Sequence, residues 1–583
     1  MTNNIRVFLW LGLALALYVN YTQWQIDYGA KPVTPTTTGS TGASEAPSEG
    51  DTVPQAAQPA ANASASTSAP TAGEDIPAAP VTAVPSADGA PVESTQPAAG
   101  KVRVVTDVLT LDIDLKGGTL VYAELPAYPI VKGQPAPVVL FNQNDAATNY
   151  VLTTGLAGST ADAAPSHLAL LSSAGSRYEL ASGQNELRVP LTWSDGKGVT
   201  VTKTFVFRRS FYVVGLEYAV DNQSAAPWVM RSYARIKRTD PAIERSMFKV
   251  ESFAFRGPVI WAKKQGDDKF TYHKLDIEKP EFIKEFPPVT GGWLAGMQHH
   301  FTSAIVPDAS KPYEYSLSTK GREYILGAVG PAETVAPGTR VVVKENLFVG
   351  PKLQAQLVTL NPELDRVADY TWLTLIAKPL FWLLDKAHSV VGNWGLAIIF
   401  VTFILKLLFY PLSEKAGRSI ARMRAIAPRM KALQETYKDD RSKLGQATMD
   451  LYRQEKVNPL AGCLPMLIQM PVFLAFYWVL LESVELRQAP FFGWLNDLSS
   501  RDPYFILPAL NGVAMWFQQK LNPPPPDPMQ AKIFQFMPVV FSVMFALFPA
   551  GLVLYWVTNT GLSILQQWNI NRKLANEDKA RRK

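Results

Sequence analysis

Apolar residues concentrate towards the two ends of this 583-residue chain, and the pattern between these ends is different. An apolar run over 7–19 is followed by no small-x-small cleavage site, which predicts an uncleaved transmembrane anchor over residues 1–29. Residues 30–100 are rich in Pro, Ala, Ser and Thr and contain no aromatic residue. They carry too little apolar surface to offset chain entropy, which predicts a disordered tether.

The middle of the chain alternates apolar and polar residues in short runs. Residues 105–115 alternate in this way and stop at Gly117-Gly118, and 199–207 and 340–348 behave similarly. This period of two, interrupted by Gly, Asn and Asp turns, is typical of half-buried strands. We therefore predict an all-β sandwich domain over residues 101–365.

Helical periodicity and long apolar runs replace the strand pattern after residue 370. Residues 370–391 form an amphipathic pattern that predicts a helix lying in the membrane interface, with an apolar face of Trp372, Leu375, Ile376, Leu380, Leu383 and Leu384. Five apolar segments then predict transmembrane helices over 392–411, 460–484, 504–520, 533–548 and 552–568, which with the anchor makes six. Several are short and contain Pro or Gln, which indicates a thin membrane or a cavity.

The segments between these spans differ in charge. Residues 412–458 predict a helical hairpin with an excess of Lys and Arg, whereas the loop 485–503 carries only Arg487 and Arg501. A short loop, 521–532, and a basic tail, 569–583, complete the chain. Because basic loops stay in the cytoplasm, we expect both termini and the hairpin to be cytoplasmic and residues 30–390 to be periplasmic in a bacterial inner membrane.

The two basic segments each allow two interpretations. The hairpin is either a packed antiparallel coiled coil with a solvated face or a docking arm for anionic lipid or ribosomal RNA. The tail is either a topology signal or a contact for RNA phosphates or lipid. The tail residues concerned are Arg572, Lys573, Arg581, Arg582 and Lys583.

Lys406 stands inside the first core span, in an otherwise apolar run. A cation at bilayer depth costs roughly 2.5–3.5 kcal/mol on insertion scales, so such residues usually face a bundle interior or a watery cavity. The alternative is a lysine near the helix end whose ammonium reaches the interface. Other polar or amphipathic residues of the spans would line the same hydrated groove or form interhelical hydrogen bonds singly: Thr402, Gln469, Tyr555, Trp556, Asn559 and Ser563.

Motifs for enzymatic chemistry are lacking. The sequence contains no HExxH, P-loop, nucleophile-elbow or dinucleotide motif, and its one cysteine, Cys463, excludes a disulfide within the chain. Asp112 and Asp114 share the wet face of a strand, and His299 and His300 would point to opposite faces of a regular strand. We therefore predict no enzymatic activity, no cofactor and no metal site.

Several strings resemble one family: Gly392-Asn-Trp-Gly395, Tyr410-Pro-Leu412, and residues 456–460, 462–471, 483–490 and 548–556. They are similar to the bacterial YidC membrane protein insertases, relatives of the mitochondrial Oxa and chloroplast Alb insertases. The resemblance covers about 370–570. The string Gly291-Gly-Trp-Leu-Ala295 and the order anchor, tether, β-domain extend it to the Gram-negative form.

The resemblance implies five core spans around a groove open to cytoplasm and lipid, with a basic residue in the first core helix. Lys406 stands at that position, where many members have Arg, and lysine lacks the guanidinium fork that grips a carboxylate. Thr402, Gln469, Trp556 and Ser563 match groove positions. The sandwich is expected to be a β-supersandwich with a sugar-binding-like shape.

The same resemblance implies the function and the partners. The chain would insert and help fold inner-membrane proteins, alone or with the Sec translocon (SecYEG) and SecDF, receiving nascent chains from the ribosome into the phospholipid bilayer, with no small-molecule substrate. A transporter is a rival, but the sequence shows no inverted repeat. A membrane-anchored carbohydrate-binding protein is another rival, but the helical part is too elaborate for an anchor alone.

Overall fold

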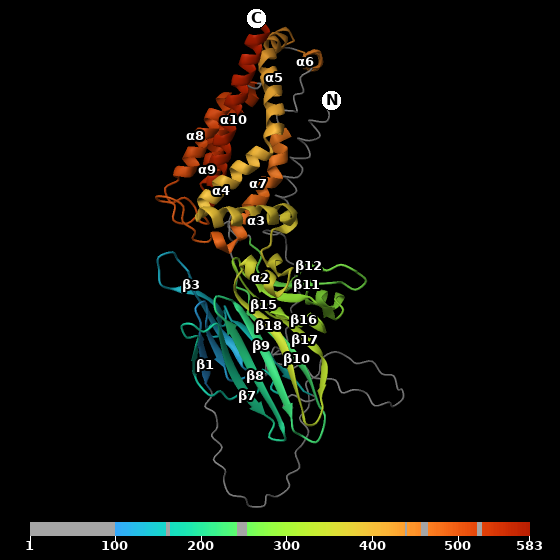
Figure 1. Cartoon of the computed structure of the whole chain (residues 1–583). Helices are drawn as coiled ribbons and strands as arrows, with labels where there is room; N and C mark the ends of the chain where they lie inside the picture. Colours follow the sequence, from blue (N-terminus) through green and yellow to red (C-terminus); the bar gives the residue numbers. More distant parts are fainter. Residues whose placement is uncertain are drawn as a thin grey trace, which may run out of the picture.

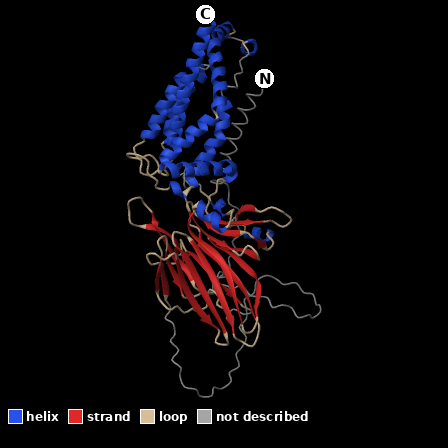
Figure 2. Ribbon diagram, in the orientation of Figure 1, coloured by secondary structure: helices blue, strands red, loops and turns tan. Residues whose placement is uncertain are grey.

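The computed structural model describes residues 100–158, 164–241, 254–437, 440–455, 464–521 and 528–582. Figures 1 and 2 show two parts in sequence, a β-sandwich and then a group of helices. The predicted anchor (1–29), the tether up to residue 99 and Lys583 lie outside the described residues. Nothing in the structure therefore tests those predictions.

Two sheets form the sandwich, and their strand pairs are antiparallel apart from β1 with β6. The ten-stranded sheet has the order β13 (Val289–Thr290), β16 (Pro312–Lys320), β17 (Glu323–Val335), β10 (Trp228–Thr239), β5 (Tyr150–Ala157), β4 (Pro137–Asn142), β3 (Thr119–Pro129), β2 (Thr110–Asp114), β1 (Lys101–Val105) and β6 (Arg177–Glu179). The eight-stranded sheet has the order β12 (Thr271–Lys274), β11 (Gly257–Ala262), β14 (Trp293–Met297), β15 (Phe301–Val306), β18 (Thr339–Pro351), β9 (Val213–Asn222), β8 (Val199–Arg208) and β7 (Glu186–Ser194). The predicted large β-sandwich is confirmed.

The alternation along β2 shows why the sequence folds in this way. Leu111 and Ile113 are fully buried between the sheets, while Asp112 lies on the opposite face. The carboxylate of Asp112 accepts a hydrogen bond from Nε of Arg103 on the neighbouring strand at 2.7 Å. The expectation that Asp112 points to the wet face is confirmed, and its partner is a surface cation.

Lys203 on β8 breaks the apolar pattern, since its side chain is buried between the sheets with 1% exposed. Its Nζ donates hydrogen bonds to the carbonyl oxygens of Gly117, Gly118 and Thr154 at 2.7, 3.0 and 2.9 Å. Burial lowers the pKa of Lys203 from 10.5 to about 7, although the carboxylate of Glu345 opposes this. The charge is thus held by backbone dipoles rather than by a contact ion pair.

Helices make up the second part and the junction with the sandwich. Their bounds are η3 (Pro280–Glu285), α2 (Gln354–Leu360), η4 (Leu364–Val367), η5 (Thr371–Leu373), α3 (Thr374–Val391), α4 (Trp394–Leu408), α5 (Tyr410–Thr436), α6 (Arg441–Gln454), α7 (Leu464–Glu482), η7 (Val484–Leu486), α8 (Ile506–Leu521), α9 (Pro528–Phe545) and α10 (Ala550–Arg582). A helix lies over each of the five predicted core segments. Among the described residues, no single helix meets the length and apolarity of a membrane span, but α4 and the start of α5 do so together.

The turn between α4 and α5 is set by Tyr410-Pro411. Proline has no N–H and disfavours a helical residue before it, so α4 ends and α5 leaves at an angle of 62°. At the other end of α4, the side chain of Asn393 accepts a hydrogen bond from the N–H of Leu396 at 3.1 Å and caps the helix. Both ends of this short helix are therefore fixed by local sequence.

The predicted hairpin is present as α5 and α6. Asp440 caps α6 by accepting from the backbone N–H of Ser442 and Lys443. Ile426, Met430 and Leu451 form a small cluster between the helices. The residues of the predicted basic tail continue α10 without a break through Arg582.

The apolar residues predicted on one face of the 370–391 helix have different surroundings in the structure. Trp372 and Leu375 are 76% and 86% exposed, so they do not pack with the rest of that face. The buried residues of α3 are Ala377, Leu380, Phe381, Leu384 and Ala387, which face α4 and α7. The two alanines allow close approach to the neighbouring helices, and α3 runs across the end of the helical part nearest the sandwich (Figure 1).

A polar junction joins the sandwich to the end of α7. The Nε2 atoms of His299 and His300 both donate to the carbonyl oxygen of Leu481, at 3.0 Å each. Their rings stack with centroids 3.8 Å apart in the turn between β14 and β15, so the expectation that they point to opposite faces was wrong. Nearby, the ammonium of Lys352 lies 3.6 Å from the carboxylate of Glu482. The sandwich therefore caps the last turn of α7.

We expect the buried Lys203 to make the sandwich more stable as the pH rises above 7. The folded protein releases this proton near pH 7, whereas the unfolded chain holds it to about 10.5, so unfolding takes up a proton in this window. The unfolding free energy should rise by up to about 1.4 kcal/mol per pH unit relative to Lys203→Met. Melting of the detergent-solubilised protein, followed by tryptophan fluorescence, checks this. The exposed Lys344→Met serves as control, and identical pH profiles for wild type and Lys203→Met would contradict the expectation.

Candidate functional site

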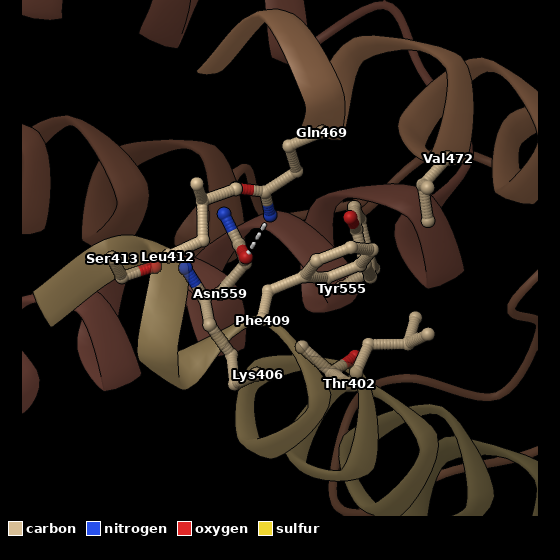
Figure 3. A pocket seen from close by; sticks show the side chains of 10 residues that line it. Thr402, Lys406, Phe409, Leu412, Ser413, Gln469, Val472, Tyr555 and Asn559 are labelled. Atoms are coloured by element: carbon tan, nitrogen blue, oxygen red, sulfur yellow. Dashed lines mark hydrogen bonds between the residues drawn. The ribbon is translucent and has the colours of Figure 1, made fainter. Parts of the chain in front are cut away.

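A small cavity with both polar and apolar lining residues lies among α4, the start of α5, α7 and α10. Its volume is about 20 Å³, and it is lined by Thr402, Leu405, Lys406, Phe409, Leu412, Ser413, Gln469, Val472, Tyr555 and Asn559 (Figure 3). A cavity of this volume holds about one water molecule. The structure thus brings five of the predicted groove residues together around a water-sized space.

Lys406 occupies the last turn of α4 and is partly buried. Its Nζ donates a hydrogen bond to Oγ of Ser563 on α10 at 2.7 Å. Among the described residues, no carboxylate lies within 4.0 Å of this ammonium. The ammonium therefore points between helices, which favours the interior position over one that reaches the interface.

Ser563 and Asn559 extend this contact into a network. Oγ of Ser563 donates to the backbone carbonyl oxygen of Asn559 at 2.7 Å, one turn earlier on α10. The side-chain oxygen of Asn559 accepts from Nε2 of Gln469 on α7 at 2.5 Å (Figure 3). Polar groups of three helices thus satisfy one another around the cavity, with a single net charge.

Thr402 and Tyr555 form part of the wall, and the hydroxyl of Tyr555 also makes a hydrogen bond with the side chain of Gln469. Thr402 is 1% exposed, and its hydroxyl donates to the carbonyl oxygen of Ile398 in its own helix at 2.6 Å. The ring of Tyr555 stacks on Phe476 with centroids 4.6 Å apart. Both side chains therefore form the wall of the cavity.

Trp556 is not among the residues that line this cavity, and its assignment to the groove stays a prediction. Its ring lies edge-on to Phe473 at 4.7 Å and tilted against Phe545 at 5.2 Å. Trp556 belongs to the packing between α7, α9 and α10.

Sequence reasoning missed part of the wall. Phe409, Leu412 and Ser413 line the cavity from the bend and the first turn of α5. The Tyr410-Pro411 pair was the available signal, because a bend there folds the start of α5 back over Lys406.

The predicted contact residues for ribosome or lipid lie away from this cavity. Arg572 and Lys573 are exposed on α10, and the guanidinium of Arg572 lies 5.6 Å from the ring of Trp568. Arg581 and Arg582 lie in the last turn of α10, where only the backbone is described. Within the described ranges, no group of three or more His, Cys, Asp or Glu residues is placed to hold a metal ion.

Two family models match the chain and together span most of it. The model described as YidC periplasmic domain matches residues 101–383, and the model described as 60Kd inner membrane protein matches residues 386–578. The boundary between them falls in α3, between the sandwich and the helices that form the cavity.

Curated relatives are similar over nearly the whole length. The chain is 44% identical to the membrane protein insertase YidC of Thioalkalivibrio sulfidiphilus, covering 98% of this chain and 99% of that protein. It is 41% identical to that of Nitrosococcus oceani, with the same coverage, and 42% identical to that of Methylococcus capsulatus, with 98% of each covered.

Solved structures give weaker similarity. A crystal structure of an active YidC insertase with its first transmembrane domain resolved has a TM-score of 0.36 and 19% identity, covering 80% of this chain and 91% of that one. A putative aldose 1-epimerase from Escherichia coli K12 has a TM-score of 0.26 and 12% identity, covering 43% and 98%.

We expect Ser563→Ala to destabilise the helical part through Lys406. Removing the hydroxyl leaves a partly buried ammonium without its acceptor, which costs about 1–3 kcal/mol. In Lys406→Met with Ser563→Ala, both polar partners are gone, so the double variant should lose less than the two single variants added together. Thermal melting in detergent checks this. Thr558→Ala, whose hydroxyl bonds only its own helix, is the matched control, and additive losses would exclude the coupling.

Proposed function

Because this chain belongs to the YidC family of membrane protein insertases, we propose that Lys406 is the cation that draws the polar end of an incoming segment into the helical part. Family membership makes the chain an inner-membrane insertase with a periplasmic domain. The proposal concerns how its own residues perform insertion.

The observation that carries the proposal is the ammonium of Lys406, bound by Ser563 at 2.7 Å and facing no carboxylate in the described part of the chain. A cation in this position interacts with an acidic group about 4 Å away by roughly 4 kcal/mol at an effective dielectric constant of 20. A neutral hydroxyl is a weaker partner than a carboxylate. An acidic residue of a passing segment therefore replaces Ser563 without breaking an ion pair.

The cavity must widen for this exchange, because its present volume of about 20 Å³ fits a water molecule and no side chain of that size. The hydrated groove predicted from the sequence is then the opened form of this site. Opening requires a contact between the helices that can be broken. The hydrogen bond between the side chains of Gln469 and Asn559 is such a contact, because it joins α7 to α10. Breaking it separates the two helices at the cavity.

Insertion by this route needs no nucleotide and no covalent step. A polar terminus must cross a hydrocarbon core about 30 Å thick, and a polar site between helices shortens the apolar part of that path. The apolar remainder of the segment then partitions into lipid, which supplies the driving force. Lys406 attracts the acidic group only while the segment passes the cavity, and the attraction is moderate in strength.

The orientation and partners complete the proposal. The basic α5–α6 hairpin and the end of α10 are cytoplasmic, as the distribution of Lys and Arg indicates. There the basic residues of α10, including Arg572 and Lys573, contact ribosomal RNA or anionic lipid. The protein acts alone or together with the Sec translocon (SecYEG) and SecDF.

We expect Lys406→Glu to slow insertion most, Lys406→Ala less, and Lys406→Arg least. Loss of about 1–2 kcal/mol of attraction corresponds to about a five- to thirty-fold slower step for substrates with an acidic translocated end. Insertion of a short membrane protein into vesicles that contain each variant measures this. Substrates with a neutralised end should respond much less.

The matched control is Lys520→Ala, which removes one cation from the exposed end of α8, where it lies over the Trp516 ring. It should insert both substrates as the wild type does. Full activity of Lys406→Ala and Lys406→Glu with the acidic substrate would overturn the role of the cation.

We also expect a photo-reactive residue at Gln469 or Leu412 to crosslink to a ribosome-stalled nascent helix in native vesicles. These positions line the cavity, whereas Val513 on α8 is 53% exposed and lies outside its lining, and Trp556 belongs to the helix packing. Crosslinks from Val513 or Trp556 that equal those from Gln469 would show that the segment passes elsewhere.

A further inference from the structure

A second and larger cavity lies where the sandwich meets α3. Its volume is about 450 Å³, and we call it the junction cavity. It is lined by Tyr272, His273, Lys274, Phe282, Arg366, Ala368, Asp369, Tyr370, Thr371 and Thr374. None of these residues lines the cavity at Lys406. Its size falls in the range of small-molecule sites in proteins.

Charged groups of both signs stand in the wall of the junction cavity. The ammonium of Lys274 forms an ion pair with the carboxylate of Asp369, and the guanidinium of Arg366 binds the carboxylate of Glu363 at 2.5 Å. The side chains of Lys274 and Arg366 are 38% and 33% exposed, so they keep donors that a ligand can reach. The lining residues include two cations and one carboxylate, so a ligand that carries both an anionic group and a cation matches both signs of charge.

Two hydroxyls of the same wall are buried without a hydrogen-bond partner among the described residues. They are Oη of Tyr272 and Oγ1 of Thr371. A buried polar group without a partner costs about 1–3 kcal/mol, so native proteins usually supply one. Burial also raises the pKa of Tyr272, which keeps its hydroxyl protonated and able to donate. Because both hydroxyl oxygens have almost no accessible surface, a ligand oxygen reaches them only after a shift of the cavity wall.

Exposed apolar side chains continue from the rim of the junction cavity. Trp372 follows directly on Thr371, and Leu375 follows Thr374, and both are largely exposed. They stand at the start of α3, which crosses the sandwich end of the helical part in Figure 1. In a membrane insertase this level is the periplasmic interface, where tryptophan is enriched beside lipid head groups. A ligand with a charged head and apolar chains fits the combination.

We propose that the junction cavity binds the head group of a zwitterionic phospholipid from the periplasmic leaflet. The phosphate lies against Lys274 and Arg366, the primary ammonium lies against Asp369, and the chains run past Trp372 and Leu375. The lipid then connects β12 of the sandwich with the start of α3. This site requires only the membrane placement of the family, so it stands or falls independently of Lys406.

The test uses the full-length protein in phosphatidylglycerol vesicles that contain a few per cent of photoreactive phosphatidylethanolamine. After irradiation, labelled peptides are mapped by mass spectrometry. We expect label within 271–274 and 366–375, and about tenfold less in Lys274→Gln and in Arg366→Gln, because each loses a charge-assisted bond to the phosphate. Lys344→Gln, a 70% exposed residue on β18, is the matched control and should label as the wild type does.

Three further measurements distinguish a zwitterionic lipid from an anionic lipid and from free phosphate. Photoreactive phosphatidylglycerol in the same vesicles should label these peptides less than phosphatidylethanolamine, and Asp369→Asn should remove that preference. Equal labelling by both lipids in the wild type, or unchanged labelling in Lys274→Gln and Arg366→Gln, overturns the proposal. Loss of the label on adding inorganic phosphate would show a site for free anions and would overturn it also. Equal melting temperatures in detergent confirm that the variants are folded.

Discussion

An ammonium group among apolar helices is the constraint on which the helical part depends. The charge of Lys406 cannot be left unsolvated, because desolvation of an ion costs several kcal/mol even after the protein relaxes. The hydroxyl of Ser563 accepts from the ammonium and is linked through Asn559 to the amide of Gln469, so polar groups of two other helices offset part of this cost. The arrangement holds the cation in place yet leaves it without a counter-charge among the described residues. If position 563 carried a carboxylate, it would form an ion pair with Lys406. The pair would stabilise the resting protein, but the ammonium could then no longer attract an acidic group of a passing segment.

At the junction with the sandwich, side-chain donors satisfy unpaired acceptors, whereas at Lys406 side-chain acceptors satisfy a charged donor. The end of α7 presents carbonyl oxygens, and the sandwich brings His299 and His300 to one of them. Burial lowers the pKa of both histidines, to about 3 for His300, so each is neutral and donates through a single N–H. The Lys352–Glu482 pair lies beside them. The junction therefore fixes the periplasmic end of a helix whose other end carries the cavity wall, and the sandwich is part of the rigid frame of the site.

The sequence predicted the sandwich and the helix positions because both follow from local periodicity, as the alternation around Ile113 and the bend at Pro411 illustrate. It predicted Lys406, Gln469 and Asn559 at the site because polar residues in apolar runs are conspicuous. It could not show that Trp556 packs against Phe473 and Phe545, since the side of a helix that faces a cavity depends on which neighbour packs there. It did not predict the burial of Lys203 or the stacking of His299 on His300, because a buried cation in a strand and two residues in a turn carry no periodic signal.

Lysine at position 406 also determines what kind of site this is. An arginine would present a planar fork and grip a carboxylate with two parallel bonds, whereas lysine offers a compact charge with three rotatable donors. One of those donors is used by Ser563 and the others are free to turn towards a passing group. The single hydrogen bond from Lys406 to Ser563 can be replaced by one to another acceptor without a precise geometry. Successive membrane segments differ in sequence and bind only transiently. A weak attraction without a fixed direction, as lysine provides, therefore suits them better than the rigid fork of arginine.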